Sequence, residues 1–90
     1  MIAELLQRGQ SNAIPLRHLE KITGLDGRSV RAQIELERRQ GVPICSDNVT
    51  GYYLAANDSE KERFVASMRG RAFEILRTAA AVEAGRKIEG

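Results

Sequence analysis

The sequence has one cysteine, one histidine and no long apolar run, and each of these absences excludes a class of protein. Cys45 alone cannot form an internal disulfide, which is typical of a reducing compartment, so we expect a cytoplasmic protein. One histidine and one cysteine cannot complete a zinc site, so His18 is expected to be a surface residue. A membrane-spanning helix needs about 20 apolar residues in succession, and the sequence predicts none.

The patterns that mark enzymes and exported proteins are missing as well. We find no paired carboxylates, no nucleophile with a base, no metal-ligand set and no phosphate-binding loop. The sequence therefore predicts no catalytic activity, no metal and no cofactor. Residues 1–10 lack a basic segment followed by an apolar core, so no secretory signal is expected there.

The composition is that of one small folded domain. The chain has 90 residues, of which 42% are hydrophobic and 29% charged, a balance that separates it from disordered chains. The net charge of +2 permits nucleic-acid binding without requiring it. The distribution of charge must therefore decide the question.

Glycines, prolines and capping residues divide the first half of the chain into three expected helices. The apolar spacing predicts a helix over 2–8, a second over 15–23 and a third over 27–40. Asp26 can cap the third helix by accepting a hydrogen bond from a free backbone N–H group. Gly41, with a proline two residues later, ends it.

The only segment that reads as β-structure follows this third helix. Strands are expected over 43–46 and 52–55, joined by a turn at 47–51. Ser59 and Glu62 form a capping-box pattern that predicts a long helix to about residue 84. Because a lone hairpin is only marginally stable, it should lie against the helices.

The predicted fold class is therefore mainly α with a small antiparallel β-hairpin, namely a winged helix-turn-helix followed by a long C-terminal helix. We expect a winged helix-turn-helix domain over residues 1–57. Residues 58–85 would form the C-terminal helix, which covers the core and can pair with a second copy, and residues 86–90 a flexible tail.

The third helix carries a basic face opposite an apolar one. At about 100° per residue, four arginines and one glutamate fall within about 100° of each other. They are Arg28, Arg31, Glu35, Arg38 and Arg39. Val30 and Ile34 lie on the opposite side. A helix with a buried back and guanidinium groups in front suits phosphates and the O6/N7 edge of guanine.

These positions define the expected DNA-binding residues. Because the first residues of a recognition helix enter the major groove, Arg28 and Arg31 are expected to read bases or phosphates and Ser29 to contact a phosphate. The remaining candidates are Arg38 and Arg39 on the same helix, Arg17 and Lys21 on the preceding helix, and Ser46, Asn48 and Thr50 in the wing. The wing turn has no Lys or Arg and carries Asp47, which weighs against insertion into the minor groove.

A less specific interpretation stands beside this one. A charged face opposite an apolar stripe is what any surface helix shows, so the helix alone fits a solvated surface equally well. The turn spacing and the hairpin favour DNA. Cys45 is expected to be a small buried strand residue, and one of Tyr52 and Tyr53 to pack on the helices while the other faces away.

The stretch "LDGRSVRAQIELERRQGVPICSDNVTGYYLA", residues 25–55, resembles the winged helix-turn-helix of biotin-ligase repressors and of many small phage and prophage proteins of Gram-positive bacteria. The resemblance is carried by Gly27, Arg28, Val30, Arg31, Gly41, Pro43, Ile44, Ser46, Gly51, Tyr52, Tyr53 and Leu54. It covers about residues 1–56, so no ligase activity is implied. The family usually carries Leu where this chain has Glu37, and Leu36 is displaced from the apolar stripe by one position.

The C-terminal helix carries a heptad seam. Apolar or small residues recur with spacings of 3, 4, 3, 4 and 3 at Val65, Met68, Ala72, Ile75, Ala79 and Val82. Phe64, Val65 and Met68 are expected to cover the domain's own core. The later positions Ala72, Ile75, Ala79 and Val82 are expected to form a homodimer interface.

The expected partner is double-stranded DNA, bound by a small prophage-type protein that acts as a transcription regulator or a replication accessory. This fold also serves protein docking. The alternative is therefore an interaction adaptor that uses the winged helix and the C-terminal helix without DNA.

Overall fold

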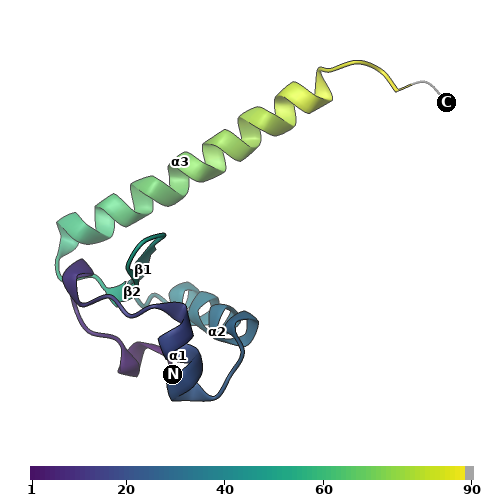
Figure 1. The fold of residues 1–90 in the computed structure, drawn as a ribbon. Helices are drawn as coiled ribbons and strands as arrows, with labels where there is room; N and C mark the ends of the chain where they lie inside the picture. The colour runs from purple at the N-terminus through teal and green to yellow at the C-terminus, as the bar shows by residue number, and fades with distance from the viewer. Residues whose placement is uncertain (89–90) are drawn as a thin grey trace.

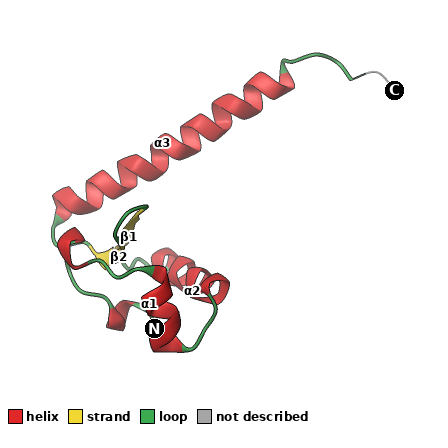
Figure 2. Ribbon diagram, viewed as in Figure 1, coloured by secondary structure: helices red, strands yellow, loops and turns green. Residues whose placement is uncertain are grey.

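The computed structural model describes residues 1–88, which fold into α-helices, short 3₁₀ helices and one two-stranded sheet (Figures 1 and 2). In chain order the elements are η1 (Ala3–Leu5), η2 (Gln10–Asn12), α1 (Leu16–Thr23), α2 (Gly27–Arg39), β1 (Ile44–Asp47), β2 (Gly51–Leu54) and α3 (Asp58–Glu83). The mainly helical class with a small antiparallel hairpin and a long C-terminal helix is confirmed. Of the expected tail 86–90, residues 89–90 lie outside the described part of the chain.

The prediction of a helix over residues 2–8 is wrong, because only the 3₁₀ turn η1 forms there. From Leu6 the backbone is extended, with φ −90° and ψ 149°. The Leu54 N–H donates to the Gln7 carbonyl at 2.9 Å, and the Gly9 N–H donates to the Leu54 carbonyl at 2.8 Å. Pairing with β2 thus uses backbone groups that a helix would have bonded internally.

The N-terminal segment covers the outer edge of the hairpin. β1 and β2 pair antiparallel, and Ile14 exchanges hydrogen bonds of 2.8 and 2.9 Å with Tyr52 on the other side of β2. At Gly51 the φ is +116°, and a side chain there would collide with the Ile14 carbonyl. Only glycine fits this close approach. The two-stranded sheet therefore gains a third, irregular partner over residues 7–14.

The hairpin is buried on both faces. One face packs on the helical core, which consists of Ile2, Leu6, Leu19, Val30, Ile34 and Ile44. Tyr52 and Leu54 lie partly buried against that core. On the other face Cys45 and Tyr53 are 1% and 5% exposed, and both share crevices with Phe64 of α3. The prediction of a buried Cys45 is confirmed, and both tyrosines are packed, one on each face.

α3 begins earlier than the capping box at Ser59 predicts. The Asn57 side chain accepts from the Glu60 N–H at 2.8 Å and is the N-cap. The Glu60 carboxylate reaches back to the Ala56 N–H at 3.0 Å and the Gln10 N–H at 3.3 Å. The cap therefore forms two residues earlier than predicted, at Asn57 and Glu60, where Glu60 also contacts the N-terminal segment.

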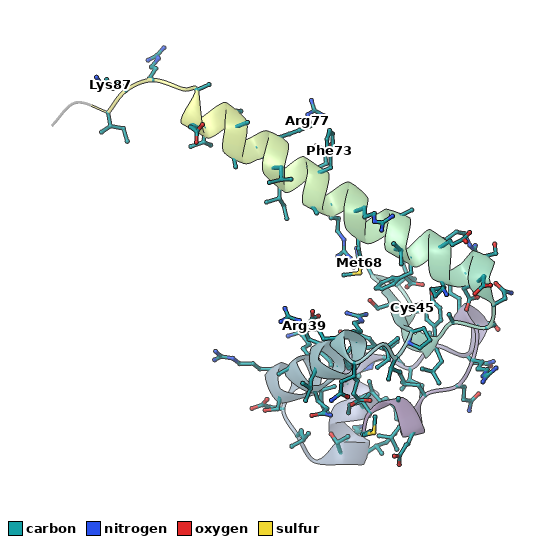
Figure 3. All side chains as sticks on the ribbon, turned by 180° about the vertical axis from the view of Figure 1, so that it is seen from behind. Arg39, Cys45, Met68, Phe73, Arg77 and Lys87 are labelled. Carbon is teal, nitrogen blue, oxygen red and sulfur yellow. The ribbon has the colours of Figure 1, made fainter. Side chains whose placement is uncertain are left out.

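Beyond its first turns α3 projects as an arm (Figure 1). Phe64 and Val65 are half-buried, as expected, whereas every residue from 66 to 83 is exposed. Met68 is 39% exposed and points toward the domain (Figure 3). The arm makes the molecule 52 Å long. No helix within residues 1–88 has the length and apolarity that crossing a membrane requires.

Glu37 is fully buried, where the resemblance led us to expect Leu. Its carboxylate accepts hydrogen bonds of 2.8 Å from the Ile2 N–H, the Ala3 N–H and the Gln33 side-chain amide. Burial alone raises the pKa of a carboxyl group, but these donors outweigh it and lower the pKa of Glu37 below its ordinary value. Glu37 therefore fixes the N-terminal segment to α2 in its charged form.

The Glu37→Gln variant is expected to lose about 1.5–3 kcal/mol of unfolding free energy at neutral pH, because the charged acceptor is lost. A group with a lowered folded pKa stabilises above its unfolded pKa and ceases to do so as pH falls through the folded one. The difference in unfolding free energy between the parent and Glu37→Gln should therefore shrink as the pH falls below about 4.5. Urea unfolding at neutral and acidic pH measures it, with exposed Glu35→Gln as the control. Equal stability of Glu37→Gln and the parent at neutral pH would contradict the role of Glu37 in fixing the N-terminal segment to α2.

Candidate nucleic-acid interface

α2 is held with one face in the core, which leaves the opposite face in solvent. Val30, Ile34 and Glu37 follow one another at intervals of four and three residues and are at most 1% exposed. Leu36 lies off this stripe and is 52% exposed, as its displacement in the sequence indicates. The solvent-facing side is therefore fixed by the packing of the buried side.

The first turns of α2 present free guanidinium groups. Asp26 caps the helix by accepting from the Ser29 N–H at 2.7 Å, and this bond lowers the pKa of Asp26. Arg28, Ser29 and Arg31 are exposed. Within residues 1–88, neither Arg28 nor Arg31 makes a side-chain hydrogen bond or an ion pair. Both arginines can therefore bind an external group without breaking an internal contact.

Arg39 is also exposed but has a partner on its own helix. Its Nε lies 3.4 Å from Glu35 Oε1, and its side chain is 79% exposed. Surface pairs of this kind contribute only about 0.3–0.5 kcal/mol. Arg39 can therefore exchange Glu35 for an external anion at little cost.

Arg38 is different, because its side chain is committed to contacts within the protein. It is 20% exposed, and its Nε donates to the Ile44 carbonyl at 2.8 Å. Its Nη2 donates to Ser46 Oγ at 3.2 Å, and its guanidinium carbon lies 4.9 Å from the centre of the Phe64 ring. Burial lowers the pKa of Arg38. Arg38 therefore links α2, β1 and α3, with Ser46 as one of its partners. Its expected contact with DNA stays a prediction.

The hairpin turn is organised around Asp47. Its carboxylate accepts from the backbone N–H groups of Val49 and Thr50 and from the Thr50 hydroxyl. Hydrogen bonds from Thr50, Gln10 and Val49 lower the pKa of Asp47 strongly, so it stays charged. Thr50 is thus used within the turn, whereas the Asn48 side chain is exposed. The acidic turn gives phosphate little attraction at its tip.

The remaining candidates lie on α1 and α3. Arg17, His18 and Lys21 are exposed on α1, and no side-chain partner within residues 1–88 holds Arg17 or Lys21. On α3 the expected dimer positions Ala72, Ile75, Ala79 and Val82 are all exposed, Ile75 by 69% and Val82 by 76%.

The sequence does not single out Arg71 among the arginines Arg63, Arg69, Arg71 and Arg77 of α3, which could add backbone contacts or merely keep the helix solvated. With Arg31 and Arg38, Arg71 lines a groove of about 440 Å³ between α2, the hairpin turn and α3. One feature of the sequence does point to Arg71. It lies seven residues, or nearly two helical turns, after Phe64, so its side chain leaves α3 on the same face as the residue expected to cover the core.

No family model, curated protein or solved structure matches this chain. Among the described residues, no group of three or more His, Cys, Asp or Glu side chains could hold a metal ion.

The two kinds of arginine on α2 should separate in stability measurements. Arg38→Ala is expected to lower the unfolding free energy by about 2–3 kcal/mol, because charged hydrogen bonds and an aromatic contact are lost. Arg28→Ala removes no internal contact and should stay within about 0.5 kcal/mol of the parent. Urea unfolding of the two variants provides the comparison. Equal effects of the two substitutions would show that Arg38 is not a structural link.

Proposed function

We propose that this chain is a small DNA-binding protein with a winged helix-turn-helix, in which α2 enters the major groove of double-stranded DNA. The observation that carries the proposal is the pair of exposed, unpartnered guanidinium groups of Arg28 and Arg31 on a helix whose other face is buried. The resemblance of residues 25–55 to prophage winged helices supports a regulator or a replication accessory.

The buried stripe of α2 would keep the helix rigid while its first turns meet the DNA. Arg28 and Arg31 would offer planar donor forks to guanine edges or phosphates, and the Ser29 hydroxyl would contact a phosphate. Arg39 would join them once it exchanges Glu35 for a phosphate. Arg17 and Lys21 would position the domain through the flanking backbone.

The hairpin would support this surface more than it would read DNA. Asp47 occupies the turn, and Ser46 and Thr50 bond within the protein. Asn48 is the wing residue left to contact a sugar or a phosphate.

We also propose that α3 joins two copies through Ala72, Ile75, Ala79 and Val82. These residues share one face of an arm that is exposed along residues 66–83. Two linked DNA-binding domains would bind much more tightly than one and would read a site with two-fold symmetry.

The alternative function is an adaptor that docks a protein and does not bind DNA. It is favoured by the exposed arm itself, which can bind another partner as well as a second copy. A salt series on duplex binding separates the two functions, since only arginine–phosphate contacts release counterions.

The double variant Arg28→Ala/Arg31→Ala tests the DNA proposal. It should weaken binding to a fluorescent duplex by about 100-fold and reduce the slope of log K against log salt by about 1–2. The control is Arg77→Ala, because Arg77 lies on the arm and points away from the domain (Figure 3). A double variant that keeps its fold and binds duplex as the parent does removes the recognition role of α2. A parent that binds no duplex at low salt supports the adaptor.

Sedimentation tests the dimer. The parent should sediment as a dimer, and Ile75→Glu should convert it to a monomer by placing a charge in the apolar seam. Arg77→Glu introduces the same residue about 160° away on the helix and should remain dimeric. A parent that stays monomeric at high concentration would contradict the proposal that α3 forms a dimer interface.

A further inference from the structure

The groove between α2, the hairpin turn and α3 gathers positive charge from two helices. Arg31 and Arg38 line it from α2 and Arg71 lines it from α3, whereas Asp47 is the one carboxylate among its lining residues. Arg31 and Arg38 are seven residues apart, so they project from the same side of α2. The groove therefore has a net positive charge.

Arg71 is directed to this groove by the packing of α3. Two turns earlier on the same face, Phe64 stacks on the Arg38 guanidinium at 4.9 Å. The charge of Arg71 is close enough to add to the effect of burial in lowering the pKa of Arg38. Within residues 1–88, Arg71 and Arg31 make no side-chain hydrogen bond or ion pair. Arg71 and Arg31 thus add positive charge beside Arg38, whose own counterion Glu35 lies at 4.0 Å, and an external anion would stabilise this arrangement.

Asp47 does not cancel this charge. Its carboxylate accepts four hydrogen bonds, from the Gln10 amide, the Val49 and Thr50 N–H groups and the Thr50 hydroxyl. These donors occupy its oxygens and offset part of its field. An anion in the groove would therefore meet arginine donors, with the carboxylate already bonded to the turn.

We propose that this groove binds a phosphate of the DNA backbone, with Arg71 and Arg31 as its ligands and Arg38 as a fixed positive charge beside them. The proposal rests on DNA binding by α2 and extends it, because it makes α3 part of the interface. One strand of the duplex would then be held between the first turns of α2 and the proximal part of the arm.

Duplex binding over a salt series tests the site with Arg71→Ala, Arg71→Lys and the control Arg77→Ala. Arg71→Ala should weaken binding about tenfold for all duplex sequences alike and lower the salt slope by about 0.9, the value for one phosphate. Arg71→Lys should keep the slope, because the charge remains, and lose less affinity. Arg77→Ala should match the parent.

The outcomes separate this proposal from the proposed function. If the parent binds duplex and Arg28→Ala/Arg31→Ala weakens it while Arg71→Ala does not, the phosphate site is overturned and DNA binding by α2 stands. If the parent binds no duplex, both the phosphate site and DNA binding by α2 are contradicted. A second measurement follows the arginine Nε–H signals by NMR during titration with inorganic phosphate. If the signals of Arg71 and Arg31 shift and that of Arg77 does not, the result supports phosphate binding in the groove. The same shifts with unchanged duplex binding by Arg71→Ala would assign it to free phosphate and overturn the DNA contact.

Discussion

A buried carboxylate holds together the part of this fold that has the least regular structure. Residues 2–14 contribute Ile2 and Leu6 to the core, yet they contain only short 3₁₀ turns. Their position depends on backbone bonds to Glu37 at one end and to β2 at the other. A charge is costly to bury unless it is hydrogen-bonded, and three donors at 2.8 Å meet that condition. Glu37 thus couples α2 to the segment that covers the hairpin edge.

Arg38 is the second link, and it lies next to Glu37 in the sequence. Whereas Glu37 bonds the N-terminal segment, Arg38 bonds β1 and stacks on α3 through Phe64. Adjacent residues on a helix point about 100° apart, so the end of α2 can hold two different neighbours at once. The end of α2 is thus tied into the fold, whereas Arg28, Ser29 and Arg31 in its first turns are exposed. The same link fixes where α3 leaves the domain and hence where Arg71 lies.

The sequence predicted the elements whose signals are local. Asp26 and the glycines after α1 and α2 marked the helix bounds, and Gly51 marked the hairpin turn. The failures involve partners that are remote in the chain. Apolar spacing over 2–8 could not reveal that the backbone there bonds Glu37 and β2. The helical wheel placed Arg38 with Arg31, but it could not show that β1 returns beside the end of α2. The sequence showed that Glu37 departs from the family pattern, but it could not show that the backbone of Ile2 and Ala3 bonds its carboxylate.

The arm of α3 raises the question of what keeps it helical. Residues 66–83 bury no side chain, although most of the stability of a helix in a protein comes from the packing of its apolar face. The alanines at 79–81 help, and the contacts of Phe64 and Val65 hold one end. A partner would supply the missing burial. In the two proposals above, the phosphate contact at Arg71 would lie near the domain end of the arm, and the contact between copies would continue along the arm to Val82. DNA held at Arg71 would order the first turns beyond the domain, and a second copy at Ile75 and Val82 would order the rest.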